Sequence, residues 1–392
     1  MPSGTSMYTS RLGRGVLPSN QEPNPISYDK HTFRPKRTRA STRPTQPQSF
    51  STLPCPLHKM PLSQGPQSKT TNHHIVCLEE CHCPIPAFSF PHTYTGYAST
   101  SPLPSEIISR LQDATIAITT LVPITREILQ ACPRLQCVIV MATGVEWVDI
   151  PAFQEKGVKV INCPGANVST VAEHALALYF ASRRKIVELH DSVMESDEYA
   201  EKRTLIHRFG NGPPHTTQQE VVAVIGYGAL GKRIEMIIRA LGMQVLIAER
   251  KGVMGGDIRE GRVPFETAIQ HATVVMVSAA KGPETVGLIG EDEFRAMRKD
   301  ALVINVARGG IADEGALVKA LKEGWIAGAA TDVFDGEPPV RGQSVLLKER
   351  VPNLTVSPHI AWFSESTIRN LQDLLVEGVE GFVEGNLVNV VC

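Results

Sequence analysis

The sequence predicts an α/β protein with two doubly wound parallel sheets, one in each of two domains. Short apolar runs typical of buried strands alternate with amphipathic helical stretches from about residue 75 onward. One of these runs, Val221–Ile225, leads directly into the glycine-rich segment Gly226–Gly231 and a helix that we expect to open at Leu230. The length of 392 residues allows two domains with full cores.

The segment Gly226–Gly231, called the glycine turn below, has the GxGxxG spacing of a dinucleotide site. Gly226 makes the turn, Gly228 lets the backbone approach a pyrophosphate, and Gly231 lets the helix pack closely on the strand. The helix N-terminus then presents free N–H groups and the positive end of its dipole to the phosphates. The expected cofactor contacts are therefore Gly226, Tyr227, Gly228, Ala229, Leu230 and Gly231.

The glycine turn also nearly fits a P-loop, because Gly226 to Lys232 reads GxxxxGK. That motif needs Ser or Thr at the next position to bind magnesium, and this chain has Arg233 there. The sequence therefore disfavours hydrolysis of a nucleoside triphosphate.

The end of the next apolar run bears on which nicotinamide cofactor binds. Glu249 stands 18 residues after Gly231, where an acid accepts hydrogen bonds from the adenosine ribose and repels a 2′-phosphate. Arg250 and Lys251 pull the other way, because a cation attracts that phosphate. Flexible cations at an exposed rim are screened, whereas an acid at a strand tip is held in place. The sequence predicts NAD or NADP, with NAD favoured.

The charge of the chain is unevenly distributed. Residues 1–70 hold ten Lys and Arg against two acids, which leaves 29 basic and 38 acidic residues for the rest. We expect residues 1–72 to form a disordered basic extension, because they are rich in polar residues and Pro and poor in apolar ones. The expected compartment is the cytoplasm, or the mitochondrion if this extension is a transit peptide. The acidic remainder argues against nucleic acid as a partner, and no apolar run reaches the roughly 18 residues of a membrane span.

The eight cysteines do not form a disulfide framework in so long a chain. Cys77, Cys81, His82 and Cys83 have the look of metal ligands, yet no second cluster completes a tetrahedral site, and Cys55 lies in the extension. We expect reduced thiols and no metal.

The order of elements gives the domain organisation. In the first unit, strands are expected at Ile75–Leu78, Thr115–Thr119, Leu135–Met141 and Val158–Asn162, and helices at Ser105–Gln112 and Thr125–Ala131. A long helix, Thr170–Glu188, follows, capped by Ser169 or Thr170 with Glu173 in its first turn, and residues 191–219 are expected to form a surface loop. The second unit adds strands at Met243–Ala248, Val274–Ser278, Leu302–Val306 and Ala327–Asp332, and a helix from Glu365 to about Glu380 closes the chain.

Four polar residues follow the strands of the second unit, which is where open α/β sheets bind ligands. Arg308 lies after the strand LVINVA, Asp332 ends the strand AGAATD, Glu337 lies in DGEPP, and His359 lies in SPHIAWF. Together they supply a cation for a carboxylate, an imidazole for a proton and an acid to tune it. This set predicts proton and hydride transfer.

With these motifs in order, the chain resembles the D-isomer-specific 2-hydroxyacid dehydrogenases. The matching segments run from about residue 75 to the end, and the PHIAW segment is most similar to the glycerate dehydrogenase and hydroxypyruvate/glyoxylate reductase branch. They are AEHALAL at 172–178, VIGYGALGK at 224–232, PETVGLI at 283–289, INVARGGIADEGAL at 304–317, GAATDVFDGEP at 328–338 and SPHIAWFSEST at 357–367.

The resemblance implies a flavodoxin-like substrate domain, residues 73–167 completed by 361–392, and a Rossmann cofactor domain, residues 168–360, with the active site in a cleft between them. It implies that a 2-oxo acid is reduced to a D-2-hydroxy acid, and the reverse. Arg308 and the backbone N–H groups near Gly144 and Val145 would bind the substrate carboxylate. His359 would donate the proton, and Glu337 would raise the proton affinity of that imidazole. Ala307 and Asp332 would contact the cofactor, Asp332 at the nicotinamide carboxamide.

The resemblance also implies a homodimer, formed through the helix at 170–188. One departure from the family pattern is Ser278–Gly282, where a proline-bearing loop is usual, so the resemblance does not predict the cofactor contacts of this segment.

An alternative function from another class is an NAD(H)-sensing corepressor-like scaffold with little turnover. Its mark would be a partner-binding segment, and the basic extension, the only candidate, has no amphipathic or aromatic pattern.

Overall fold

The computed structural model describes residues 73–210 and 212–392, and the expected extension at 1–72 lies outside them. Within the described part of the chain, no helix has the length and apolar character needed to cross a membrane.

The first sheet is five-stranded and parallel, in the order β2-β1-β3-β4-β5. The strands are β1 (His73–Cys77), β2 (His92–Gly96), β3 (Ile116–Thr119), β4 (Cys137–Val140) and β5 (Lys159–Asn162).

Helices cover both faces of this sheet. Ala117 faces α1 (Pro104–Leu111), α2 (Arg126–Ala131) and α3 (Ile150–Lys156), while Ile116 and Ile118 face α11 (Glu365–Glu384). This division follows from the alternation of side chains along a strand. Burial on both faces explains why the strands read as continuous apolar runs.

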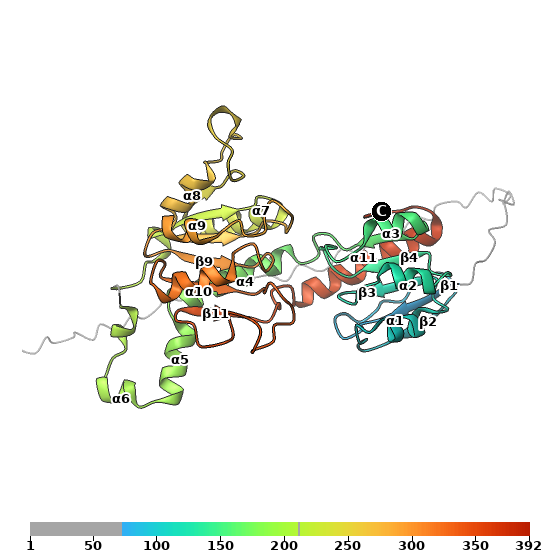
Figure 1. The fold of residues 1–392 in the computed structure, drawn as a ribbon, viewed down its shortest axis with the longest axis horizontal. Coiled ribbons are helices and arrows are strands. Elements are labelled where there is room, and N and C mark those ends of the chain that lie inside the picture. Colours follow the sequence, from blue (N-terminus) through green and yellow to red (C-terminus); the bar gives the residue numbers. More distant parts are fainter. Residues whose placement is uncertain (1–72, 211) are drawn as a thin grey trace, which may run out of the picture. The chain divides into compact units, whose positions relative to one another are not determined.

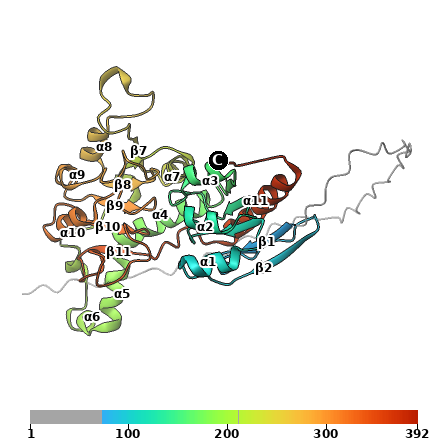
Figure 2. The same ribbon diagram turned by 45° about the vertical axis from the view of Figure 1, so that its right-hand side comes forward.

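The second sheet is six-stranded and parallel, in the order β11-β10-β9-β8-β6-β7. Two helices, α4 (Val168–Arg183) and α7 (Ala229–Ala240), pack on one face, and α8 (Phe265–His271), α9 (Glu291–Ala296) and α10 (Glu314–Lys322) pack on the other (Figures 1 and 2). The predicted α/β class with two parallel sheets is confirmed. The strands are β6 (Val221–Ile225), β7 (Gln244–Ile247), β8 (Val274–Val277), β9 (Leu302–Asn305), β10 (Gly328–Thr331) and β11 (Leu354–Val356).

Both sheets have a point where the strand order reverses. In the first sheet it lies between β1 and β3, and in the second between β6 and β8. Open α/β sheets bind ligands outside the carboxyl ends of the strands at such a switch point. The glycine turn follows β6 and therefore lies at the switch point of the second sheet.

The predicted long helix at 170–188 is wrong in its bounds. α4 ends at Arg183, because Lys185 adopts a left-handed conformation (φ 49°), and a new helix, α5 (Ile186–Glu195), starts there. The N-cap of α4 is Asn167, not Ser169 or Thr170, and the first turn of α4 holds no acid. The Thr170 hydroxyl instead lies 2.7 Å from Ser364 Oγ at the start of α11.

The expected surface loop at 191–219 is partly helical. It contains the end of α5, then α6 (Glu198–Lys202) and the short 3₁₀ turns Ile206–Phe209 and Thr217–Gln219. Glu198 orders this stretch, because its carboxylate accepts hydrogen bonds from Lys202, His207 and Arg208. β2, α3 and β11 were also not expected from the sequence.

Candidate active site

The glycine turn is built by two close backbone contacts. Gly226 has φ +88°, and an added side chain there would overlap the backbone of Ala279. At Gly231 an added side chain would overlap the carbonyl of Gly226, so α7 can approach the turn only without one. At Gly228 a Cβ would meet nothing within 4 Å. The turn is therefore tightly packed on its protein side and open at its middle glycine.

This geometry fits a nicotinamide dinucleotide. α7 starts at Ala229, and no side chain caps its N-terminus at Gly228. The backbone N–H groups of the first turn, with Leu230 among them, are thus presented to the open space beside Gly228, where a pyrophosphate carries negative charge. Tyr227 projects from the turn and its hydroxyl hydrogen-bonds the Glu235 carboxylate on α7.

Glu249 follows β7, but its carboxylate is already occupied. The residue is 4% exposed, and the Arg259 side chain binds both carboxylate oxygens, at 2.7 Å from Nε to Oε2. Hydrogen bonds from Arg259 lower the pKa of Glu249 to about 2. Arg250 contributes its backbone N–H, which lies 2.9 Å from Oε1. Arg259 was not expected, since nothing in the motif spacing marks it.

His359 and Glu337 form a direct pair. The distance from His359 Nδ1 to Glu337 Oε2 is 2.5 Å, and Glu337 Oε1 accepts from the backbone N–H of Phe334 at 2.8 Å. A carboxylate at Nδ1 places the proton on that nitrogen, which leaves Nε2 as the ring atom for proton exchange with a substrate. The side chains of His359 and Glu337 are 37% and 30% exposed, so the pair is reachable from solvent.

Asp332 holds the loop that carries His359. Its fully buried carboxylate accepts from the Ser357 hydroxyl at 2.5 Å and from the backbone N–H groups of Ile360 and Ala361 at 3.1 and 2.8 Å. The backbone N–H of His359 donates to the Asp332 carbonyl at 2.7 Å, with His359 at φ 51°. These bonds fix a conformation that a residue other than glycine rarely adopts, a kind of strain that clusters at functional sites.

The pKa of Asp332 reflects two opposing effects. Burial acts to raise it, but hydrogen bonds from His174, Ser357 and the backbone outweigh burial and lower it below the ordinary value. Asp332 is therefore a charged acid in the fold. Its expected contact with a nicotinamide carboxamide stays a prediction.

Arg308 lies after β9 in a loop that Asn305 ties down. The Asn305 amide donates to the Arg308 carbonyl at 3.0 Å and accepts from the Ala307 N–H at 3.1 Å. The guanidinium donates to the Ala307 carbonyl at 2.8 Å and to Glu146 at 3.2 Å. An added side chain at Gly144 would overlap this guanidinium, so the two predicted carboxylate-binding elements do meet.

Val145 follows Gly144 and packs against the apolar core of the first sheet. Its neighbour Glu146 was not expected, although it lies one residue beyond the predicted pair Gly144–Val145. Glu146 places a carboxylate on Arg308, the group that a 2-oxo acid would present to the same guanidinium.

Three loops bring the predicted catalytic residues into one cluster. An added side chain at Gly309 would overlap the carbonyl of Phe334, so the loop of Arg308 packs against the loop of Glu337. Glu337 in turn bonds His359. The three loops follow β9, β10 and β11, which are neighbours in the sheet. Parallel strands place their carboxyl ends at one edge, which explains why residues 51 positions apart in the sequence, Arg308 and His359, lie in connected loops.

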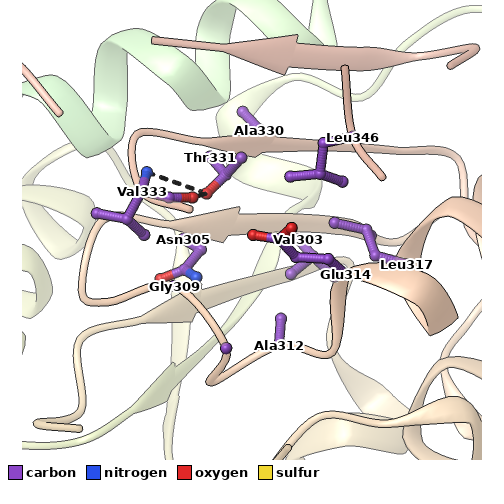
Figure 3. Close-up of a pocket in the computed structure, with 11 residues that line it drawn as sticks. Val303, Asn305, Gly309, Ala312, Glu314, Leu317, Ala330, Thr331, Val333 and Leu346 are labelled. Atoms are coloured by element: carbon purple, nitrogen blue, oxygen red, sulfur yellow. Dashed lines mark hydrogen bonds between the residues drawn. The ribbon is translucent and has the colours of Figure 1, made fainter. Parts of the chain in front are cut away.

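A small pocket lies behind these loops, between β9, β10 and α10 (Figure 3). The Glu314 carboxylate points into it and accepts from the backbone N–H of Asp335 at 2.7 Å, and burial raises the pKa of Glu314. The pocket is lined by Val303, Asn305, Gly309, Gly310, Ala312, Glu314, Leu317, Ala330, Thr331, Val333 and Leu346.

Comparison with known proteins identifies the family of the chain. The family model described as D-isomer specific 2-hydroxyacid dehydrogenase, NAD binding domain, matches residues 176–361. A glycerate dehydrogenase from Methylorubrum extorquens is 39% identical over 313 residues, covering 80% of this chain and 96% of the relative. A hydroxypyruvate reductase from Blautia hydrogenotrophica is 30% identical over 287 residues, covering 73% of this chain and 87% of the relative.

A solved structure has the same fold at lower identity. The NADPH-dependent glyoxylate/hydroxypyruvate reductase from Sinorhizobium meliloti, in complex with NADP and malonate, gives a TM-score of 0.67 at 21% identity. The match covers 82% of this chain and 97% of that one. Because the glycerate dehydrogenase is 39% identical over 80% of this chain, the chain belongs to the D-isomer-specific 2-hydroxyacid dehydrogenase family, on its glycerate dehydrogenase branch. It is therefore an NAD(P)-dependent oxidoreductase.

Proposed function

We propose that the protein reduces glyoxylate, hydroxypyruvate or a similarly small 2-oxo acid to the D-2-hydroxy acid, and catalyses the reverse reaction. The observation that carries the proposal is the His359–Glu337 pair, 2.5 Å apart, in a loop connected to that of Arg308. The names of the similar chains, a glycerate dehydrogenase and a hydroxypyruvate reductase, support the substrate class.

The proposed roles follow from the chemistry of each group. The Arg308 guanidinium binds the substrate carboxylate, because its planar fork matches two oxygens, and the backbone N–H groups of Gly144 and Val145 bind the same carboxylate. His359 Nε2 donates a proton to the ketone oxygen in the reduction and takes it back in the oxidation. Glu337 orients the imidazole and compensates its positive charge.

A reduced nicotinamide cofactor supplies the hydride in this reaction. In our proposal the glycine turn binds its pyrophosphate, Ala307 and Asp332 lie beside its nicotinamide, and the loop at Glu249 receives its ribose. Residues 168–360 form the cofactor domain, and residues 73–167 with 361–392 form the substrate domain. The packing of Leu371, Leu375 and Val379 of α11 on the first sheet supports this division.

For the choice of cofactor we propose a modest preference for NADH. Glu249 places a negative charge at the strand tip, which disfavours the 2′-phosphate of NADPH. Arg259 offsets part of this charge, so the preference is small.

We also propose a homodimer formed through the end of α4 and the α5–α6 arm, residues 186–206. α5 and α6 turn away from the six-stranded sheet (Figure 1), and this arm exposes large apolar side chains. Met194 is 71% exposed and Ile206 is 75% exposed, which is costly unless a partner covers them. Light scattering at micromolar concentration tests the dimer, and a monomer would contradict it.

The experiment that tests the function is steady-state turnover of glyoxylate, hydroxypyruvate, pyruvate and phenylpyruvate with NADH and with NADPH. We expect turnover of glyoxylate and hydroxypyruvate to be fastest. His359→Ala should lower kcat by about 10²–10⁴ while the affinity for cofactor stays nearly unchanged. The matched control is His271→Ala on α8, which should retain full activity.

Two outcomes would contradict the proposal. A loss below tenfold in His359→Ala would remove this histidine from proton transfer. Cofactor binding with negligible turnover of every oxo acid would instead indicate the scaffold alternative.

A further inference from the structure

The loop of residues 250–263, called the β7–α8 loop here, leaves β7 and returns to the same strand. Ala248 pairs with Val263 in a parallel bridge. The Glu249 N–H donates to the Val263 carbonyl at 2.8 Å, and the Val263 N–H donates to the Ile247 carbonyl at 2.9 Å. Figures 1 and 2 show the loop projecting beside α8. Closure at its base brings Arg259, ten positions along the chain, back to Glu249.

The carboxylate of Glu249 has its acceptor sites filled. Oε1 accepts from the Arg250 N–H at 2.9 Å and from Arg259 Nη2, and Oε2 accepts from Arg259 Nε at 2.7 Å and from the Arg259 N–H at 3.3 Å. A carboxylate offers about four lone-pair sites. A ribose hydroxyl can therefore bond to Glu249 only by displacing one of these donors.

The donor that can leave is the guanidinium of Arg259. Its side chain is 51% exposed, whereas that of Glu249 is 2% exposed and the backbone N–H groups are fixed by the loop. A guanidinium has five N–H donors, and Arg259 spends two of them on Glu249. The other three can bind a phosphate while the ion pair stays closed. A 2′-phosphate thus meets a neutralised acid, while a 2′-hydroxyl meets an occupied one.

Two other cations near the strand tip have contacts of their own, and one of them, Arg262, also lies near Glu249. Lys251 Nζ lies 2.7 Å from a Glu293 oxygen and 5.8 Å from the centre of the Phe265 ring. Arg262 lies with its guanidinium carbon 5.5 Å from the centre of the Tyr227 ring, and its Nε is 3.8 Å from Glu249. Arg250 and Lys251 were expected to oppose the charge of Glu249, but the contacts favour Arg259 in that role.

We propose that Arg259 sets the choice between NADH and NADPH. With the Arg259–Glu249 pair closed, the site accepts the 2′-phosphate of NADPH, and with the pair open, Glu249 accepts the 2′-hydroxyl of NADH. Because opening a pair with a half-exposed guanidinium costs little, Glu249 still gives the modest preference for NADH proposed above, but the preference stays below about tenfold. The inference rests on the proposed function in one respect, which is the binding of a dinucleotide at the glycine turn.

The test measures equilibrium binding of NADH and NADPH to the full chain without substrate, by the fluorescence of the bound nicotinamide or by calorimetry. Arg259→Ala should raise the Kd for NADPH about 30-fold, because the phosphate loses a charge-assisted hydrogen bond and meets a Glu249 whose charge only the more distant Arg262 and two backbone N–H groups still offset. The Kd for NADH should stay the same or fall, because the competing guanidinium is gone. Arg259→Lys keeps the charge without the fork and should fall between the two.

The control is Arg250→Ala, which removes a neighbouring cation and should change the ratio of the two Kd values less than threefold. If Arg259→Ala does not fold, Arg259→Gln, which retains hydrogen bonding without charge, replaces it. A ratio of the two Kd values that is the same in Arg259→Ala as in the wild type overturns the role of Arg259 while leaving the proposed function intact. A wild-type protein that binds neither dinucleotide overturns both.

Discussion

The switch points of the two sheets are alike in strand order and opposite in what fills them. In the first sheet, the Glu79 carboxylate after β1 accepts from the backbone N–H groups of Thr120, Leu121 and Val122 at 2.7 to 3.2 Å, in the loop that follows β3. Glu79 is 5% exposed. In the second sheet, the loop after β6 is the glycine turn, and a Cβ at Gly228 would meet nothing.

The difference shows how one topology gives a ligand site at one place and a closed joint at another. The loops and helices that follow parallel strands direct backbone N–H groups to the carboxyl edge of the sheet, which attracts an anion. At the first switch point the protein supplies that anion itself, through Glu79. At the second switch point the glycines remove the side chains, and the space is left for the pyrophosphate of the proposed cofactor.

The largest effect should come from filling the open switch point. Gly228→Val places a branched side chain where the pyrophosphate approaches, and we expect the Kd for NADH and NADPH to rise about 100-fold. The melting temperature should change little, because the backbone at Gly228 is extended and the new side chain meets no protein atom. Calorimetry of binding and of unfolding measures both quantities.

Two further glycines sharpen this result. Gly231→Val should lower the melting temperature as well as the affinity, because its side chain would overlap the Gly226 carbonyl. Gly342→Val, at an exposed position with open space, should leave both quantities unchanged. A Gly228 variant that binds cofactor like the wild type would show that the turn does not hold the pyrophosphate.

A smaller effect should come from weakening the closed switch point. Glu79→Gln replaces a carboxylate by an amide, which turns one acceptor into a donor facing the N–H groups of residues 120–122. We expect the free energy of unfolding to fall by about 2 kcal/mol, the cost of leaving buried donors without a partner. Denaturant titration measures it, with the exposed Glu127→Gln on α2 as control.

The affinity for cofactor should depend on the second switch point and not on the first. It should stay within about twofold in Glu79→Gln, since this residue belongs to the first sheet. A large loss of affinity with unchanged stability would contradict the view that Glu79 has a structural role.

Much of this organisation could be predicted from the sequence, because it depends on local patterns. Strands buried on both faces are continuous apolar runs, and the glycine turn has a fixed spacing. Arg308 and Glu337 were found because each follows an expected strand of one parallel sheet, whereas His359 was found from the segment SPHIAWF, and the family resemblance gave all three their roles. The chain folds them into connected loops, as the distances around Glu337 show.

The features that were missed depend on tertiary contacts. β2 is an edge strand with the mixed sequence HTYTG and mostly exposed residues, so it carries no apolar run. The break between α4 and α5 depends on the backbone at Lys185, and the sequence there contains neither Gly nor Pro. The pairs Arg308–Glu146 and Arg259–Glu249 join residues that no periodicity relates, so only the folded chain reveals them.

The smallest effect concerns Glu249, which differs from Glu79 in the donor that satisfies it. Backbone N–H groups hold Glu79, whereas a half-exposed guanidinium holds much of Glu249. The pKa of Glu249 is lowered from 4.5 to about 2, chiefly by Arg259. A carboxyl group whose pKa is lower in the folded state stabilises the fold fully above its unfolded pKa, and this stabilisation is lost as the pH falls from about 4.5 to about 2.

The difference in free energy of unfolding between wild type and Arg259→Ala, measured in urea, should therefore be larger at pH 6 than at pH 3. Because the guanidinium is exposed, 0.5 M salt should also reduce the difference at pH 6. An equal difference at both pH values would mean that Arg259 stabilises the loop by packing rather than through the charge of Glu249.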